Sequence, residues 1–174
     1  YADVNHDGIL DKDDMVFLGS SDPAVYGGLQ NTFNIYNLEL GIFFTYSLGG
    51  KIYNISEFLL GTGVSTSNKY SYMAEGAWHA ERNPNGNLPS AKVTENYASS
   101  RFVHDSSFLR LKTLSVSYRF DLKKHVKWLR DISVGAYMDN LFLVTKYNGF
   151  DPDVSSSKSV QRLDDASYPN PRTY

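Results

Sequence analysis

The 174-residue sequence has no cysteine, which excludes disulfide bonds, thiolate metal sites and cysteine nucleophiles. No apolar run approaches the roughly 18 residues that a membrane-spanning helix needs, and the mean hydropathy is −0.38. Basic and acidic residues nearly balance, 17 against 19, so no nucleic-acid partner is expected. These absences still allow soluble β-proteins and membrane barrels, because barrel strands give a weak hydropathy signal.

Catalytic motifs are missing as well. The sequence contains no nucleophile elbow, phosphate-binding loop or HExxH pattern. The four histidines are isolated from one another at positions 6, 79, 104 and 125. We therefore predict that the protein is not an enzyme.

Alternation of apolar and polar residues is the strongest positive signal. In residues 131–142, Ile132, Val134, Ala136 and Met138 share one face, and polar or small residues share the other. This pattern predicts a strand that buries one face against a protein core or against lipid. Asn140-Leu141-Phe142 is predicted to close the strand, and Asp151-Pro152-Asp153 provides turn chemistry after it.

Three further stretches alternate in the same way. Residues 24–36 and 38–48 are predicted to form a hairpin joined at Tyr36-Asn37. Residues 106–120 predict a third strand, in which the apolar phase flips before Thr113. A β-bulge, or a passage out of the apolar zone, would explain the flip. The basic stretch 121–130 is most simply a solvated turn.

The first fourteen residues contain a pattern typical of calcium-binding loops. Oxygen-bearing positions recur with the spacing D-x-[DN]-x-[DN]-G, and the predicted ligands are Asp3, Asn5, Asp7, Ile9 through its carbonyl, Asp11 and Asp14. Ca²⁺ prefers six to eight oxygen ligands, and Gly8 permits the sharp turn that gathers them. Asp14 replaces the usual Glu. A structural Ca²⁺ is predicted here, with a metal-free polar turn as the alternative.

Residues 49–106 lack sustained periodicity. Short helices are predicted at Ile55 to Leu60 and Met73 to Glu81. A loop of this length in a compact domain usually serves a function. Trp78, Tyr70 and Tyr72 are weak candidates for stacking on a substrate such as a sugar ring; packing of the loop on itself is the alternative.

The lengths of the connections favour lipid over a protein core. Between successive strands they are short, long, short and long, so the long loops fall at one end of an up-and-down sheet. Outer-membrane barrels have this asymmetry, and the aromatic residues at the strand ends suit their interfacial girdles. A soluble sandwich remains the alternative. The chain begins without Met and stops where a new strand starts near Arg172, so we expect a piece of a longer polypeptide.

Several stretches then resemble one family. SSFLRLKTLSVSYRF, MDNLFLVTKYNGFDPDV and YPNPRTY are similar to the C-terminal part of SusC/RagA-type TonB-dependent outer-membrane transporters. DVNHDGILDKDD with LGSSDPAVYGGLQNTF is similar to the segment that precedes those strands. The resemblance implies an all-β fold, in which the chain supplies the last strands of a large antiparallel transmembrane barrel of 22 strands.

The resemblance also implies an orientation. Residues 1–23, 49–106 and 143–171 would be extracellular loops, the calcium-type loop among them. The hairpin 24–48 and the strand pair 107–142 would cross the membrane with periplasmic turns, and 172–174 would start the last strand. The location would be the outer membrane of a Gram-negative bacterium.

The implied function is active import of oligosaccharides or peptides. The implied partners are a SusD-like surface lipoprotein, outer-membrane lipid, and TonB through upstream regions outside this chain. The alternative from a different class is a secreted, calcium-stabilised β-domain that binds glycan. Such a domain would fold alone and stay soluble without detergent, whereas a partial barrel leaves open strand edges.

Overall fold

A computed structural model describes residues 3–9, 11–63, 66–90, 99–123, 128–153 and 162–174. The chain divides into two compact units. We call Asp22–Gly50, Asp105–Val154 and Tyr168–Tyr174 the strand unit, and Tyr1–Ser21, Lys51–His104 and Ser155–Ser167 the loop unit. Within the described ranges, no helix is both long enough and apolar enough to cross a membrane.

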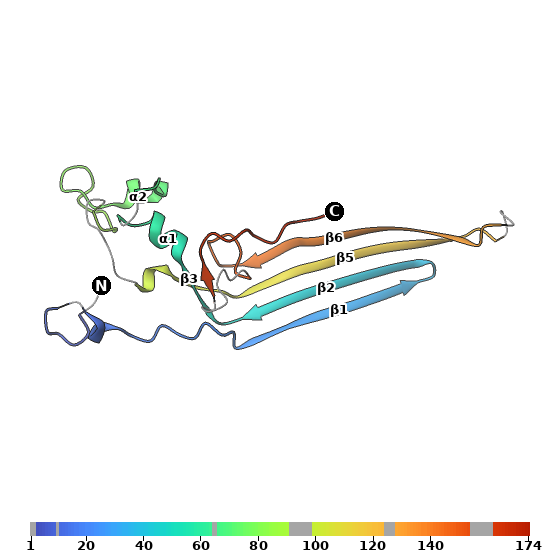
Figure 1. The fold of residues 1–174 in the computed structure, drawn as a ribbon, viewed down its shortest axis with the longest axis horizontal. Helices are drawn as coiled ribbons and strands as arrows, with labels where there is room; N and C mark the ends of the chain where they lie inside the picture. The colour runs from blue at the N-terminus through green and yellow to red at the C-terminus, as the bar shows by residue number, and fades with distance from the viewer. Residues whose placement is uncertain (1–2, 10, 64–65, 91–98, 124–127, 154–161) are drawn as a thin grey trace. The chain divides into compact units, whose positions relative to one another are not determined.

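The strand unit is an antiparallel sheet of four long strands, in the order β1-β2-β5-β6 (Figure 1). The strands are β1 (Val25–Ile35), β2 (Leu38–Leu48), β5 (Phe108–Asp121) and β6 (Asp131–Thr145). Tyr36 takes a φ of 55°, in the left-handed region that two-residue hairpin turns use. The predicted hairpin and the two later strands are therefore confirmed.

The register aligns the apolar residues of all four strands on one face of the sheet. Phe33 lies opposite Leu40, Leu40 opposite Val116, and Val116 opposite Ala136. Large members of this face are strongly exposed within the chain, Val134 at 60% and Leu29 at 57%. The other face carries mainly polar or small residues, among them Glu39, Ser117 and Gly135 in one row across three strands, although Phe43 also lies on it. The sheet thus has one apolar face with no protein core of its own, as a strand facing lipid requires.

A bulge explains the phase flip in β5. Thr113 pairs with Phe43 and Leu111 pairs with Phe44, so the register skips Lys112. Lys112 is the extra residue in β5, so the apolar residues before and after it lie on the same face of the sheet. Leu111 and Leu114 consequently lie on the apolar face, and the predicted bulge is confirmed.

The bulge continues into β6 and alters its predicted end. Thr113 pairs with Asp139 and Leu111 with Phe142, which leaves Asn140 in the bulge at a φ of 52°. The strand therefore does not close at residues 140–142 but runs on to Thr145. A further pairing starts at Thr173, which forms an antiparallel bridge with Asp139.

Two adjacent glycines of β1 face aromatic rings of β2. A Cβ on Gly28 would come within 2.8 Å of the Phe43 ring, and one on Gly27 within 2.9 Å of the Tyr46 hydroxyl. Strand glycines often mark such close approaches, because only hydrogen leaves room for a ring against the backbone. These positions therefore tolerate no larger residue without a shift of the rings.

The loop unit has short elements around a small core. They are η1 (Lys12–Asp14), β3 (Lys51–Asn54), α1 (Ile55–Leu60), α2 (Ser71–Gly76), η2 (Ser100–Phe102), β4 (Val103–Asp105) and β7 (Leu163–Asp164). The small sheet has the order β4-β3-β7, and β3 runs parallel to β7. Ile52, Met73 and Phe102 are buried, and the Phe58 and Phe102 rings meet edge to face with centroids 5.3 Å apart.

The two predicted helices of this unit have different outcomes. The helix at Ile55 to Leu60 is confirmed, and Asn54 caps it by accepting the Glu57 N–H at 2.8 Å. The helix predicted over Met73 to Glu81 is wrong, since α2 ends at Gly76. Backbone bonds from Trp78 to Leu88 and from Leu88 to Gly76 turn the chain away there. The small sheet was not predicted, and Lys124, His125 and Lys127 of the basic connection lie outside the described residues.

Candidate functional site

The first half of the acidic loop converges on Asp3. Its Oδ1 accepts the Asp7 N–H at 3.2 Å, and its Oδ2 accepts the Gly8 N–H at 2.8 Å. His6 and Gly8 take φ angles of 62° and 80°, which bend the backbone around this carboxylate. The side chain at the first position of the pattern thus organises the turn at the sixth.

Asn5 and Asp7 are brought together inside the same turn. Asn5 Nδ2 donates to Asp7 Oδ2 at 2.9 Å, while Asn5 Oδ1 accepts the Asp7 N–H at 3.1 Å. The other Asp7 oxygen accepts the Ile9 N–H at 2.7 Å. Four of the six predicted ligand positions therefore belong to one connected hydrogen-bond network.

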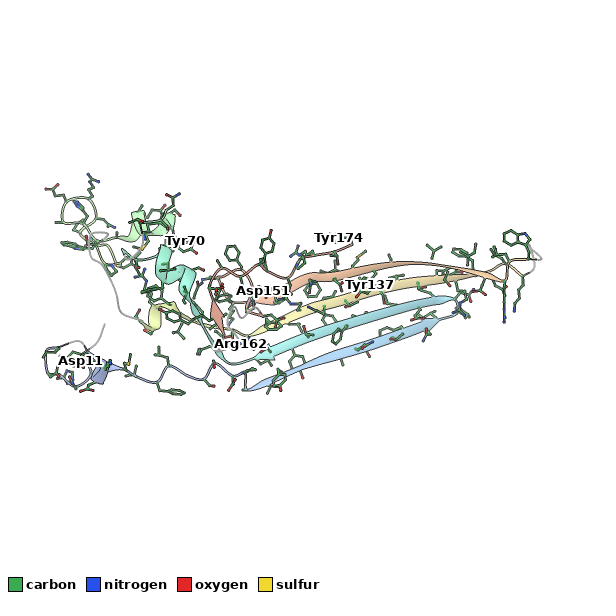
Figure 2. All side chains as sticks on the ribbon, viewed as in Figure 1. Asp11, Tyr70, Tyr137, Asp151, Arg162 and Tyr174 are labelled. Atoms are coloured by element: carbon green, nitrogen blue, oxygen red, sulfur yellow. The ribbon has the colours of Figure 1, made fainter. Side chains whose placement is uncertain are left out.

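Asp14 joins the two ends of the loop through its two carboxylate oxygens. Figure 2 labels Asp11 in the same loop. One Asp14 oxygen accepts the Val4 N–H at 2.7 Å, and the other accepts the Asp11 N–H at 3.0 Å. Asp11 in turn caps η1 by accepting the Asp13 N–H at 2.8 Å. The backbone N–H groups of Asp11 and Val4 hold the pKa of Asp14 below its ordinary value, because they stabilise the ionised carboxylate.

The donor set of this loop fits a hard cation by its chemistry. Carboxylates, an amide oxygen and a backbone carbonyl are the ligands that Ca²⁺ prefers. Across the described ranges, no group of three or more His, Cys, Asp or Glu side chains has an arrangement that could hold a metal ion. The carboxylates point into the loop, where they accept backbone N–H groups, and the loop is closed by these bonds.

The three aromatic candidates separate into a pair and a single residue. Tyr70 and Tyr72 stack with ring centroids 5.4 Å apart and an interplanar angle of 15° (Tyr70 in Figure 2). Burial, and the nearby Glu57 carboxylate, raise the pKa of both phenols. Trp78, 47% exposed, belongs to the turn that follows α2. Exposed aromatic faces can stack on a ring, and the structure brings two of the three candidates together.

Glu57, which accepts a hydrogen bond from the Tyr72 hydroxyl at 3.5 Å, also contacts a histidine. His104 Nε2 and Glu57 Oε2 are 2.5 Å apart, and their side chains are 23% and 21% exposed. Arg101 donates to the Gly61 carbonyl at 2.7 Å and lies 5.0 Å above the Phe102 ring centroid. These contacts fasten α1 to η2 and β4, so their evident role is to hold the loop unit together.

One buried ion pair of the strand unit was not predicted from the sequence. Arg110 and Asp151, 3% and 2% exposed, form an ion pair in the strand unit (Asp151 in Figure 2). Asp151 also accepts the Asp153 N–H at 3.0 Å, and from Asn170 the backbone N–H at 3.2 Å and the Nδ2 at 3.1 Å. The carboxylate therefore connects β5 to the turn after β6 and to the segment that contains Asn170.

The pKa of Asp151 is held below its ordinary value. Burial alone would raise it, but the donated hydrogen bonds of Asp153 and Asn170 and the positive charge of Arg110 outweigh that effect. The sequence signal for this site was present in part, since Asp151-Pro152-Asp153 was recognised as a turn. Nothing local in the sequence indicates that Arg110 is its partner.

The known proteins whose sequences resemble this chain are TonB-dependent receptors. No family model matches the chain. The TonB-dependent receptor P26 of Formosa agariphila is 32% identical over 185 residues, which cover 99% of this chain and 18% of that protein. The TonB-dependent receptor SusC of Bacteroides thetaiotaomicron is 27% identical over 177 residues, 100% of this chain and 17% of that protein.

Solved structures give the same result. A structure described as the RagAB peptide transporter matches with a TM-score of 0.75 and 26% identity, over 90% of this chain and 17% of that chain. The open-open state of the RagAB peptide importer matches with a TM-score of 0.73. The chain thus spans less than a fifth of the length of the proteins it matches.

Proposed function

Because this chain is homologous, over almost its whole length, to part of the SusC/RagA-type TonB-dependent receptors, we propose that it works in an active outer-membrane transporter. It is a fragment of that transmembrane β-barrel. The observation that carries the proposal is a face that runs across four antiparallel strands and is apolar except at Asn31, opposite a mainly polar face. Such a sheet suits lipid on one side and a wet lumen on the other.

The proposed transporter imports oligosaccharides or peptides, works with a SusD-like surface lipoprotein and draws energy through TonB. One matching structure is described as a peptide importer, which supports the peptide class as a candidate. Residues 1–23, 49–106 and 143–171 are proposed to face the cell exterior, and Tyr36-Asn37 and 121–130 the periplasm. Tyr70, Tyr72 and Trp78 then lie on the side where substrate arrives, and we keep them as the candidate contacts.

The first test is a semi-native gel of outer membranes solubilised in mild detergent. An antibody to residues 150–165 should detect a chain several-fold heavier than 19.6 kDa that migrates faster before boiling than after it. Closed barrels resist unfolding in the cold gel and unfold on heating. A 19.6 kDa species in the soluble fraction would instead support the glycan-binding domain, and the transporter proposal would be abandoned.

The second test concerns import itself. Cells that carry the transporter should take up labelled oligosaccharide or peptide, and uptake should stop when TonB is absent. Replacing both tyrosines, Tyr70→Ala with Tyr72→Ala, should raise the half-saturating substrate concentration several-fold, because an aromatic stacking contact contributes about 0.5–1.5 kcal/mol. Uptake that persists without TonB would contradict the proposal that TonB supplies the energy for import.

A structural Ca²⁺ in the acidic loop is part of the proposal. Asp3, Asn5, Asp7, Asp11, Asp14 and the Ile9 carbonyl would hold it, and the ion would neutralise the carboxylates and stiffen the loop. The support is the donor chemistry and the connected network around Asp3 and Asp7.

The calcium proposal is tested by replacing Asp3 and Asp7 with Ala in the full-length transporter. Elemental analysis should then find about one Ca²⁺ fewer per chain, and protease should cut within residues 1–23 more readily. Asp13→Ala is the matched control, because Asp13 lies in the same loop but occupies no ligand position of the pattern. A loop that stays unchanged with chelator and with the double substitution has no such metal.

A further inference from the structure

The end of α2 and the segment after it form a small lobe, residues 75–88, closed by backbone hydrogen bonds (Figure 1). Trp78 N–H donates to the Leu88 carbonyl at 2.9 Å, and Leu88 N–H donates to the Gly76 carbonyl at 3.0 Å. Nearer the tip, His79 and Asn83 exchange two backbone bonds of 3.0 Å each. The lobe therefore has a closed base and a closed turn, 79–83.

The imidazole of His79 supports this turn from within. Its Nδ1 accepts the backbone N–H of Glu81 at 3.2 Å and that of Arg82 at 3.2 Å. A ring nitrogen accepts a hydrogen bond only when it carries no proton, so both bonds require a neutral imidazole protonated on Nε2. A second proton on His79 would sit on Nδ1. The Nδ1–H would then face the N–H groups of Glu81 and Arg82, and none of the three would have an acceptor.

The remaining bonds of the lobe do not depend on pH. Asn83 Nδ2 donates to the carbonyls of Glu75 at 2.8 Å and Ala77 at 3.2 Å. Within the lobe itself, the charged residues are Glu75 at the end of α2, and Glu81 and Arg82 in the turn that His79 supports. Carboxylates ordinarily titrate near pH 4 and Arg stays charged, so only histidine changes its charge between about pH 5 and 8.

We propose that this lobe is a pH-responsive element, which is closed at neutral pH and opens when His79 takes up its second proton. The sign follows from linkage. The added proton is compatible with the open turn alone, so lowering the pH shifts the equilibrium toward the open form. Trp78 precedes His79 and its N–H closes the base of the lobe, so opening changes how this indole is presented.

The experiment is hydrogen exchange, followed by mass spectrometry, on the full-length protein in mild detergent. Between about pH 7.4 and about pH 5.4, a group that binds a proton only in the open turn raises the open population by roughly several-fold. After correction for intrinsic exchange rates, protection of the amides in 79–86 should fall by that factor. Strand amides of β2 and β5 in the same sample are the internal control.

Substitutions separate His79 from its neighbours. His79→Asn keeps an acceptor, since an Asn oxygen accepts N–H groups two or three residues ahead, but it does not titrate. Its protection should be independent of pH. His79→Ala lacks the acceptor and should show low protection at both pH values, whereas Glu81→Gln should respond as the wild type does. Unchanged protection in the wild type, or a wild-type response in His79→Asn, overturns the proposal.

Discussion

The two units each contain a contact between ionisable side chains, and these two contacts differ in their burial. In the strand unit, Asp151 is 2% exposed and is paired with Arg110, and hydrogen bonds from Asp153 and Asn170 complete its partners. In the loop unit, Glu57 and His104 form a pair that is more than a fifth exposed. Water solvates the second pair in part and the first hardly at all.

The difference indicates which contacts hold each unit. A charge removed from water is stable only with a full set of partners, so loss of one partner is costly. A pair that keeps contact with water contributes little, because solvent replaces a lost partner. We infer that the Arg110–Asp151 network joins β5 to the turn after β6 in the strand unit, whereas the Glu57–His104 contact adds little to a loop unit that buries Ile52, Met73 and Phe102.

The largest expected effect is that of Asp151→Ala. The change leaves Arg110 buried without its carboxylate and should lower the free energy of unfolding by about 3–5 kcal/mol. Urea unfolding of the full-length barrel, followed on a semi-native gel, measures it. Asp153→Ala is the matched control, because Asp153 is 39% exposed and its Oδ2 lies 3.9 Å from Arg110 Nε; its loss should cost less than about 1 kcal/mol. Equal losses of stability in Asp151→Ala and Asp153→Ala would show that burial does not distinguish the two carboxylates.

The same network predicts a response to acid. Because the pKa of Asp151 is lower in the folded state than its ordinary value of 3.8, its contribution to stability is complete above that value and is lost as the pH falls through the lower, folded value. Asp151→Asn should therefore flatten the acid limb of the stability profile below about pH 4. An unchanged acid limb would show that other carboxylates govern it.

A second effect tests what covers the apolar face of the strand unit. Val116→Lys places a charge on this face and should cost roughly 2–4 kcal/mol if lipid covers it at mid-depth. Ser117→Lys changes the neighbouring residue on the polar face and should cost well under about 1 kcal/mol, since a wet lumen solvates the ammonium group. Folding yield into vesicles gives both values. Similar costs for the two variants would contradict the assignment of the faces.

The smallest effect is expected in the loop unit. Glu57→Gln removes the charge from the pair with His104 while it keeps an oxygen that can accept a hydrogen bond. The expected loss is about 0.2–1 kcal/mol, measured as faster hydrogen exchange in α1. A loss as large as that of Asp151→Ala would mean that the two pairs are equivalent and that exposure does not distinguish them.

Local periodicity predicted the strands well. A strand alternates with a period of two whatever it packs against, so β1, β2, β5 and most of β6 could be found from their own residues. The bulge at Lys112 was also visible, as a flip in the phase of Leu109 and Leu111 against Leu114. The acidic loop was recognised because its ligand positions follow one another closely; whether Ca²⁺ binds there stays a prediction.

Errors arose where neighbours in sequence do not decide the outcome. The residues from Met73 to Glu81 have no helix breaker after Gly76. The helix α2 nevertheless ends there, because the Trp78 N–H donates to the Leu88 carbonyl instead of to a helical partner. The pairing of β3 with β7 joins Tyr53 to Leu163, and no local pattern indicates such a contact.

The sequence by itself thus determined the strands, their two faces and the oxygen-rich loop, since each depends on residues within a few positions of one another. Only the tertiary structure decided that Arg110 pairs with Asp151 and that Tyr53 of β3 lies opposite Leu163 of β7. The first pairing joins residues 41 positions apart. The free energy of such contacts depends on burial and geometry, which arise only when the chain has folded.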